Sequence, residues 1–334
     1  MLKTILFTHD DLDGGGCRII FEIVHSHMIK GDDYDVINCS NQSIEDDVNT
    51  KMNSGYIDLN THICFADICV CDKTLSDLKD KGYNIMIWDH HRSNLFASWI
   101  IPEAIIEIEN DFGVPQCGTS LMYQYFAKLG YYGDDRGKHL MPEITQKTLG
   151  KLVDTIRSYD TYEWKQTNNL EAKKLNTLFY LMGINNFCER YVSRIIKNEI
   201  TTCSDILLVD NDLKFVIDEK IRREQKIINC ITPDDICELN VKGYKVAFSF
   251  PVIGASVSEL GNQFLIKYPE YDIFMGFHVN NNDGISVSFR SIKEDVDVSK
   301  IASMIGGGGH IKAAGASLNI YLKDIIINTI ESLY

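Results

Sequence analysis

The segment Phe7–Cys17 (FTHDDLDGGGC) gathers one histidine and three aspartates directly before three glycines. On extended backbone the side chains of His9, Asp11 and Asp13 share one face, because alternate residues of a strand point the same way. The apolar run Leu2–Thr8 predicts a strand, so these side chains would lie just beyond its carboxyl end. Carboxylates crowded together repel one another, and a divalent cation removes that cost. An acidic, solvated turn is the alternative.

Two later runs of strand length end in the same residue types. His62–Ala66 is followed by Asp67, and Tyr83–Trp88 is followed by Asp89–His91. Helical spacing between the runs predicts a parallel sheet with helices on its faces, and ligand crevices lie at the carboxyl ends of such strands. Mixed carboxylate and imidazole ligands suit Mn²⁺ or a similar cation, and there are enough of them for two ions about 3.5–4 Å apart.

Composition narrows the class of protein. The 334 residues suit two domains. The net charge is −14, and the clearest basic cluster, Lys220–Lys226, is short. This charge argues against long duplex nucleic acid as a partner, whereas a small phosphate compound remains compatible with it. No apolar run reaches membrane-spanning length, so we expect no membrane span. The pattern of the first residues indicates a strand rather than a signal peptide. The ten cysteines are scattered, which favours buried thiols and a cytoplasmic location.

The rest of the chain falls into a helical middle and a second α/β part. Pro142 and Glu143 predict the start of a helix that runs towards Asp160. A long amphipathic stretch, residues 213–231, predicts a connecting helix. Strands and helices then resume, with a hairpin turn expected at 280–284 and a glycine loop at 306–310. The predicted strands are 246–250, 273–279 and 285–290, and the predicted helices are 256–266 and 298–305.

These motifs, in this order, resemble the DHH phosphoesterase superfamily. The resemblance rests on His9–Gly14, Asp67 and Asp89–His91 for the first three motifs, and on Asp160 in RSYDTYEW for the fourth. Gly306–Gly315 (GGGGHIKAAG) resembles the glycine-rich motif of the DHH-associated domain. The first motif is most similar to the NrnB-like oligoribonucleases, or nanoRNases. The run of three glycines within it should loosen the start of the first helix.

The resemblance implies a fold and a metal site. The fold would be α/β, with a parallel-sheet catalytic domain (1–195), a helical connector (196–235) and a smaller α/β substrate-binding domain (236–334). Two divalent ions are implied, Mn²⁺ in the first place and Mg²⁺ or Co²⁺ as alternatives. Asp67 would bridge them, with His9 and Asp11 on one ion and the remaining ligands on the other. The implied ligands are His9, Asp11, Asp13, Asp67, His90 and Asp160.

The resemblance also implies roles for the neighbouring residues. Asp89 would orient a histidine, and His91 would lie near the scissile phosphate as a donor or proton-transfer group; pure structural support is the alternative. Gly118–Ser120 resembles a family segment near the site, although a helix cap explains it equally well. The implied substrate contacts are Arg290, Gly307, Gly308, Gly309 and His310. The alternatives are a solvated arginine at the strand end and a plain glycine turn.

The implied activity is hydrolysis of short RNA or dinucleotides to nucleoside 5′-monophosphates by a metal-activated hydroxide, in a cleft between the domains. An enzyme of the same chemistry that hydrolyses cyclic mono- or dinucleotides or the bisphosphate pAp is the first alternative. A non-catalytic nucleotide sensor is the second, although no ligand of the implied set is missing. A homodimer is compatible with the sequence.

Overall fold

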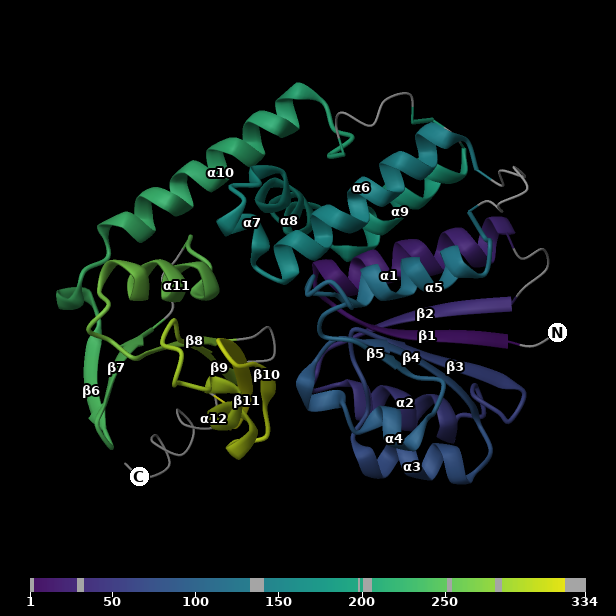
Figure 1. Ribbon diagram of the computed structural model, residues 1–334, viewed down its shortest axis with the longest axis horizontal. Helices are drawn as coiled ribbons and strands as arrows, with labels where there is room; N and C mark the ends of the chain where they lie inside the picture. Colours follow the sequence, from purple (N-terminus) through teal and green to yellow (C-terminus); the bar gives the residue numbers. More distant parts are fainter. Residues whose placement is uncertain are drawn as a thin grey trace, which may run out of the picture. The chain divides into compact units, whose positions relative to one another are not determined.

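The computed structural model describes residues 3–28, 33–132, 141–197, 199–200, 206–250, 254–279 and 284–321 (Figure 1). The chain divides into two compact units, residues 1–217 and 218–334, and the boundary falls within helix α10 (Asn211–Cys230). Each unit contains a sheet flanked by helices, which confirms the predicted α/β class. The division at residues 195 and 235 stays a prediction.

The first unit is built on a five-stranded, fully parallel sheet in the order β2-β1-β3-β4-β5. The three strands predicted from the apolar runs are present as β1, β3 and β4, and each differs from the prediction by one residue at one or both ends. β1, β3 and β4 are neighbours, so their carboxyl ends lie side by side. The strands are β1 (Lys3–His9), β2 (Asp33–Cys39), β3 (Thr61–Ala66), β4 (Asn84–Asp89) and β5 (Ile105–Ile106).

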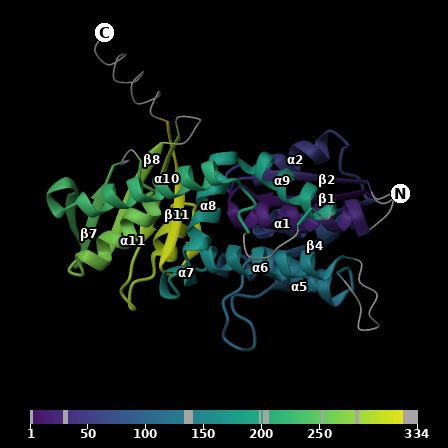
Figure 2. The same ribbon diagram turned by 90° about the horizontal axis from the view of Figure 1, so that it is seen from above.

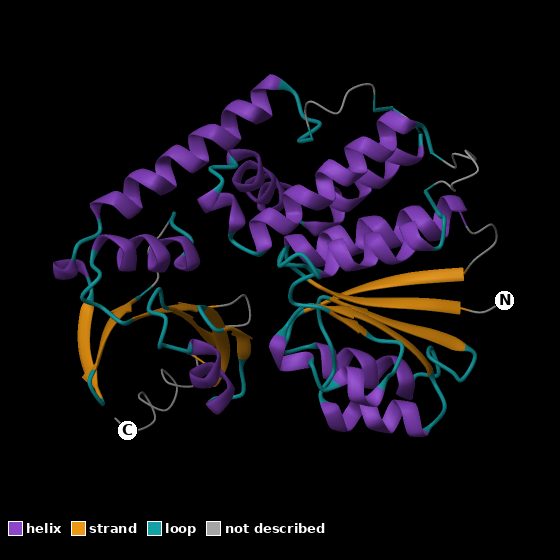
Figure 3. Ribbon diagram, viewed as in Figure 1, coloured by secondary structure: helices purple, strands orange, loops and turns teal. Residues whose placement is uncertain are grey.

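Helices cover both faces of this sheet (Figures 1 and 3). On one face α2 (Ile44–Asn53), α3 (Asp72–Asp80) and α4 (Ala97–Ile100) bury a core with Phe7 and Phe65 at its centre. The other face carries α1 and α5, with further helices packed beyond them. Pro142 caps α6 as predicted, whereas α2 was not predicted. The helices on this side are α1 (Leu12–Ile23), α5 (Gly118–Lys128), α6 (Glu143–Asp160), α7 (Glu163–Gln166), α8 (Leu170–Met182) and α9 (Ile184–Ile196).

The three consecutive glycines lie inside α1, and the expectation that they loosen its start is wrong. The Asp11 carboxylate caps the helix by accepting from Gly14 N–H at 3.0 Å. A Cβ at Gly14 would lie 2.0 Å from the carbonyl oxygen of His9, and one at Gly16 would lie 2.2 Å from Thr119 Oγ1. The glycines therefore let α1 approach β1 and α5 closely.

The second unit contains a six-stranded sheet in the order β10-β11-β9-β8-β7-β6, in which the β7–β8 pair alone is parallel. Helix α11 (Val257–Lys267) packs on one face through Leu260 and Phe264 (Figures 1 and 2). Helix α12 (Val298–Met304) packs on the other through Val298 and Ala302 (Figure 1). The strands are β6 (Cys237–Val241), β7 (Tyr244–Ser249), β8 (Ile273–Val279), β9 (Gly284–Arg290), β10 (Gly308–His310) and β11 (Ala313–Tyr321).

Part of the expected glycine loop is a strand. Gly308–His310 forms β10, which pairs with β11 so that Gly308 faces Gly315. A Cβ at Gly307 would lie 2.1 Å from the carbonyl oxygen of Gly315, so this edge pairing needs glycine. β6 and β11 were not predicted, and residues 280–283 of the expected hairpin lie outside the described residues. Within the described part of the chain, no helix combines the length and apolar character needed to cross a membrane.

Candidate metal centre

The carboxyl edge of the first sheet collects the predicted site residues. His9 ends β1, Asp67 directly follows β3, and Asp89 ends β4, with His90 and His91 after it. Asp67 has a φ of +59°, in the left-handed region that aspartate tolerates better than most residues. Its backbone N–H still donates to the carbonyl of Trp88 at 2.9 Å, so Asp67 stays anchored to β4 while its backbone turns away from the strand.

Several groups of side chains place one possible ligand atom each within 4.8 Å of one another, and two of these groups consist entirely of predicted ligands. The first is His9, Asp11 and Asp67, and the second is Asp13, Asp67 and His90. Asp67 belongs to both groups, which is the arrangement expected of a bridging carboxylate. The first group is one predicted ligand set, the second is the other set without Asp160, and metal binding by them stays a prediction.

The sixth predicted ligand, Asp160, ends α6 and reaches the same place. Its Oδ2 lies 3.4 Å from His90 Nε2, and His90 Nε2 lies 3.2 Å from Asp67 Oδ1. Asp67 Oδ2 and Asp160 Oδ2 are buried and form no hydrogen bond within the described residues. Buried carboxylate oxygens without a donor are costly, and oxygen and imidazole atoms are ligands of hard and borderline divalent cations. The donor set therefore fits such ions.

The pKa values reflect the crowding of charge. Burial and the charges of Asp13 and Asp11 raise the pKa of Asp67 well above its usual range, and the same causes raise that of Asp160. Burial would lower the pKa of His9, but its neighbouring carboxylates, Asp11 above all, raise it to about 9. The Nδ1 atom of His9 lies 2.9 Å from Asp11 Oδ2. Without a cation, the site therefore retains protons that a cation would displace.

Asp13 is held by a helix that is distant in the sequence. Its Oδ2 accepts from Gly118 N–H at 2.7 Å and its Oδ1 from Thr119 N–H at 2.9 Å. These donors belong to the first turn of α5, where unpaired N–H groups favour an anion. The segment Gly118–Ser120 thus begins a helix and also orients Asp13, so the two interpretations of it are compatible.

Asp89 organises the loop after β4. Its Oδ1 accepts from the backbone N–H groups of His90 and His91 and lies 2.8 Å from His91 Nδ1. Its Oδ2 accepts from Asn94 Nδ2 at 2.6 Å. Burial would raise the pKa of Asp89, but the charge and hydrogen bond of His91 hold it below its usual range. Asn94 was missed in the sequence, where its only signal is a polar residue five positions after Asp89.

The predicted substrate residues lie together in the second unit. Arg290 ends β9, pairs with Ala313 of β11, and Ala313 pairs with His310 of β10. Paired residues of antiparallel strands point to the same face, so Arg290 and His310 share a face two strands apart. Arg290 Nη1 donates to the carbonyl of Phe289 at 2.7 Å, and its Nη2 donates to Ser258 Oγ of α11. Substrate binding by this face stays a prediction.

Three comparisons bear on the family of this chain. The model of the DHHA1 domain matches residues 245–333. The oligoribonuclease NrnB of Bacillus subtilis is 26% identical over 328 residues, which cover 96% of this chain and 74% of that protein. A 3′,5′-cyclic-nucleotide phosphodiesterase of Helicobacter pylori is 21% identical, over 96% of this chain and 94% of that protein.

Among solved structures, RecJ from Thermus thermophilus in complex with Mn²⁺ matches with a TM-score of 0.53 and 12% identity, over 95% of this chain and 49% of that one. An exonuclease RecJ bound to manganese matches with a TM-score of 0.51 and 13% identity, over 95% and 86%. At these identities the likeness concerns the fold. Motifs, fold and relatives agree: the chain is similar to NrnB-like proteins of the DHH superfamily over most of its length, and residues 245–333 match the DHHA1 domain.

Proposed function

We propose that this chain is a metal-dependent phosphodiesterase that hydrolyses short oligoribonucleotides and dinucleotides to nucleoside 5′-monophosphates. The observation that carries the proposal is the convergence of carboxylates and imidazoles on Asp67, with two buried carboxylate oxygens that form no hydrogen bond within the described residues. The names of the relatives, an oligoribonuclease and a cyclic-nucleotide phosphodiesterase, support hydrolysis of phosphoesters. The net charge of −14 favours a short substrate over a long polyanion.

The six predicted ligands would hold two divalent ions, with Mn²⁺ as our first expectation. Such ions supply a nucleophile at neutral pH and offset the negative charge that develops at phosphorus. The protein contributes the orientation of its side chains. Gly118 and Thr119 hold both oxygens of Asp13, and the hydrogen bond from Gly14 holds Asp11.

His91 is the proposed proton-transfer group. Asp89 Oδ1, an acceptor, faces His91 Nδ1, and this contact selects the tautomer with hydrogen on Nδ1. Nε2 is then the ring atom that exchanges a proton with the substrate. Asn94 and the two backbone N–H groups keep the Asp89 carboxylate in place for this role.

Arg290 and His310 are the proposed substrate contacts of the second unit. A guanidinium group recognises phosphate through two parallel hydrogen bonds, and the contact with Ser258 restrains its position. Replacement of Arg290 by glutamine should raise KM for a dinucleotide by on the order of tenfold while Mn²⁺ affinity is retained. Arg222→Gln, an exposed arginine of α10, is the matched control and should leave KM unchanged.

The direct test is hydrolysis of a 5′-labelled RNA series, from dinucleotide to long oligomer, with Mn²⁺ and with EDTA. The panel also contains pAp, cAMP, and one linear and one cyclic dinucleotide. Metal-dependent release of mononucleotides, fastest on the shortest RNA, supports the proposal. Turnover restricted to pAp or cyclic nucleotides would overturn the substrate assignment and retain the chemistry. Nucleotide binding without any turnover would favour a sensor.

A further inference from the structure

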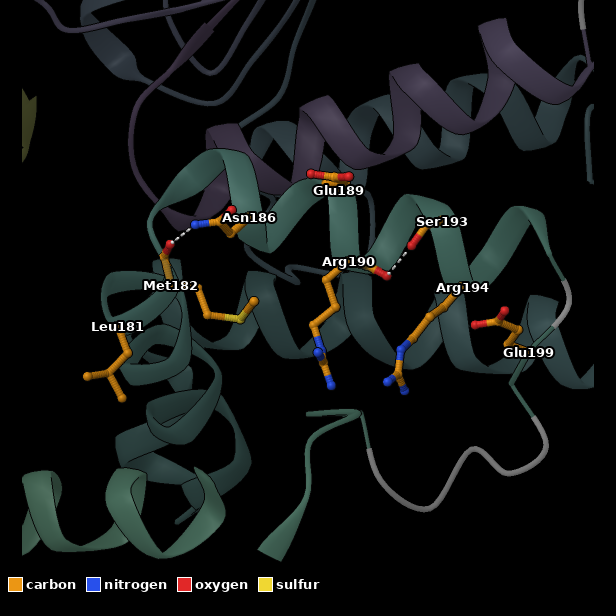
Figure 4. Close-up of a pocket in the computed structure, with 8 residues that line it drawn as sticks. All are labelled: Leu181, Met182, Asn186, Glu189, Arg190, Ser193, Arg194 and Glu199. Carbon is orange, nitrogen blue, oxygen red and sulfur yellow. Dashed lines mark hydrogen bonds between the residues drawn. The ribbon is translucent and has the colours of Figure 1, made fainter. Parts of the chain in front are cut away.

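The first unit contains an open hollow of about 500 Å³ that includes none of the predicted metal ligands. One stretch of chain, the end of α8 together with α9 and Glu199, supplies every lining residue (Figure 4). The lining residues are Leu181, Met182, Asn186, Glu189, Arg190, Ser193, Arg194 and Glu199. The mechanism proposed above uses none of them.

Two arginines dominate this hollow. Arg190 and Arg194 are four residues apart on α9, and Figure 4 shows both guanidinium groups on the same side of the helix. Like charges at this spacing repel each other. Other arginines of the chain, such as Arg18 and Arg157, form ion pairs with Glu22 and Glu163. Among the described residues, neither Arg190 nor Arg194 forms an ion pair, although the negative charge of Asp210 acts on Arg190 from a longer distance.

Contacts within the protein satisfy part of the hydrogen-bonding capacity of the Arg190 guanidinium and little of that of Arg194. Arg190 Nη2 donates to the carbonyl of Leu208, so this side chain tethers the segment before α10. Its Nε is buried and has no hydrogen-bond acceptor within the described residues. The structure assigns the Arg194 guanidinium no hydrogen bond to any described residue. The two guanidinium groups therefore keep N–H donors and positive charge at the hollow that contacts within the protein do not use.

We propose that this hollow is a second anion site, which binds the phosphate group of a small phosphate compound between Arg190 and Arg194. Arginine presents a planar set of donors that matches phosphate oxygens, and a dianion would relieve the repulsion between the two guanidinium groups. Figure 4 draws Glu189 on the other side of α9 from these groups. The net charge of −14 selects against a long polyanion here as it does elsewhere on the chain.

The shape of the lining distinguishes two sources of that phosphate group. Leu181 and Met182 form an apolar end beside the amide of Asn186, and the volume is within the range of sites for small molecules. A nucleoside monophosphate would contact both the apolar end and the arginines, whereas inorganic phosphate would contact the arginines alone. The site goes beyond the proposed phosphodiesterase activity and does not depend on it.

The test is calorimetric titration of the full chain with inorganic phosphate and, separately, with AMP. EDTA is present throughout, so that no divalent ion can hold phosphate at the metal centre. Arg194→Gln should weaken binding by on the order of tenfold, and Arg194→Lys should weaken it less, because the charge remains and the fork is lost. Glu199→Gln should strengthen binding, since it removes a competing negative charge from the lining.

Lys197→Gln is the matched control, because Lys197 is exposed at the C-terminal cap of α9 and does not line the hollow. It removes the same charge and should leave binding unchanged. Tighter binding of AMP than of phosphate would assign a nucleotide to the site, and equal binding would assign phosphate alone. Absence of binding by the wild-type chain, or equal weakening by Arg194→Gln and Lys197→Gln, would overturn the proposal.

Discussion

The carboxylate of Asp13 accepts a hydrogen bond from Gly118 N–H at 2.7 Å, across 105 positions of sequence. The start of α5 is therefore part of the candidate metal centre. Gly118 also lies against the bridging candidate, because a Cβ at this position would be 2.8 Å from Asp67 Cβ and 3.1 Å from Asp67 N. The two central carboxylates are thus positioned by the same glycine.

Gly118→Ala should damage the metal centre. The added methyl group meets the backbone of Asp67, which cannot move as a flexible side chain would, so we expect a loss of about 1–3 kcal/mol in the free energy of unfolding. Mn²⁺ affinity should fall with it, as Asp13 and Asp67 are displaced. Thermal unfolding with and without Mn²⁺ measures both effects.

Gly150→Ala is the control for that change. Gly150 lies inside α6, and a Cβ there would meet only Tyr123 Oη, at an ordinary 3.7 Å. This variant should gain about 0.5–1 kcal/mol, as alanine usually does over glycine within a helix. Equal destabilisation by both variants would contradict the close packing assigned to Gly118.

Asp67→Asn should separate stability from activity. The raised pKa of Asp67 means that its negative charge costs free energy in the metal-free fold, so the neutral amide should stabilise the protein in EDTA. Stabilisation by Mn²⁺ should largely disappear, and turnover should fall by at least about a hundredfold. Unfolding in EDTA and in Mn²⁺, together with hydrolysis of a dinucleotide, tests these outcomes.

Asp10→Asn is the neighbouring control, because Asp10 lies beside His9 but outside the predicted ligand set. It should keep most of the response to Mn²⁺. If it lost as much of that response as Asp67→Asn does, the assignment of the ligands would be wrong.

Asn94→Ala should lower turnover through Asp89 and His91. It removes the donor at 2.6 Å from Asp89 Oδ2, so the carboxylate that orients His91 becomes less restrained. Loss of such outer partners typically costs 10–100-fold in activity or metal affinity. We expect a lower kcat with little change in KM, and a shift in the pH profile of kcat. Ser93→Ala, an exposed change in the same turn, should have neither effect.

The affinity for Mn²⁺ should rise with pH. The pKa of His9 is raised from its ordinary 6.5 to about 9, and those of Asp67 and Asp160 are raised, so the folded metal-free protein binds more protons than the unfolded chain. The free energy of unfolding without metal therefore falls as pH rises, and the contribution of His9 is present below 6.5 and lost towards about 9.

A cation must displace these protons, so each proton released should strengthen binding by about tenfold per pH unit within that window. Calorimetry at several pH values, in buffers of different ionisation enthalpy, measures affinity and proton release together. An affinity that stays constant between pH 6 and pH 9 would refute the proton competition.

Much of this architecture can be predicted from local patterns. An apolar run long enough for a strand predicted β1, β3 and β4, and parallel strands end at one edge, so the residues after them must meet there. That argument alone brought His9, Asp67 and Asp89–His91 together. It needed no knowledge of which side chains touch, because the period of the backbone determines where a strand ends and which way its residues point.

The partners within the site depend on packing between distant segments. Nothing near Asp13 in the sequence indicates that Gly118 and Thr119 hold it, and Asn94 carries no local sign of its bond to Asp89. The low helix propensity of glycine predicted a loosened helix start at Gly14–Gly16. That prediction is wrong because close contact with β1 and α5 outweighs propensity in a buried helix. Local periodicity set the strands and their ends, whereas long-range contacts selected the residues that orient each ligand.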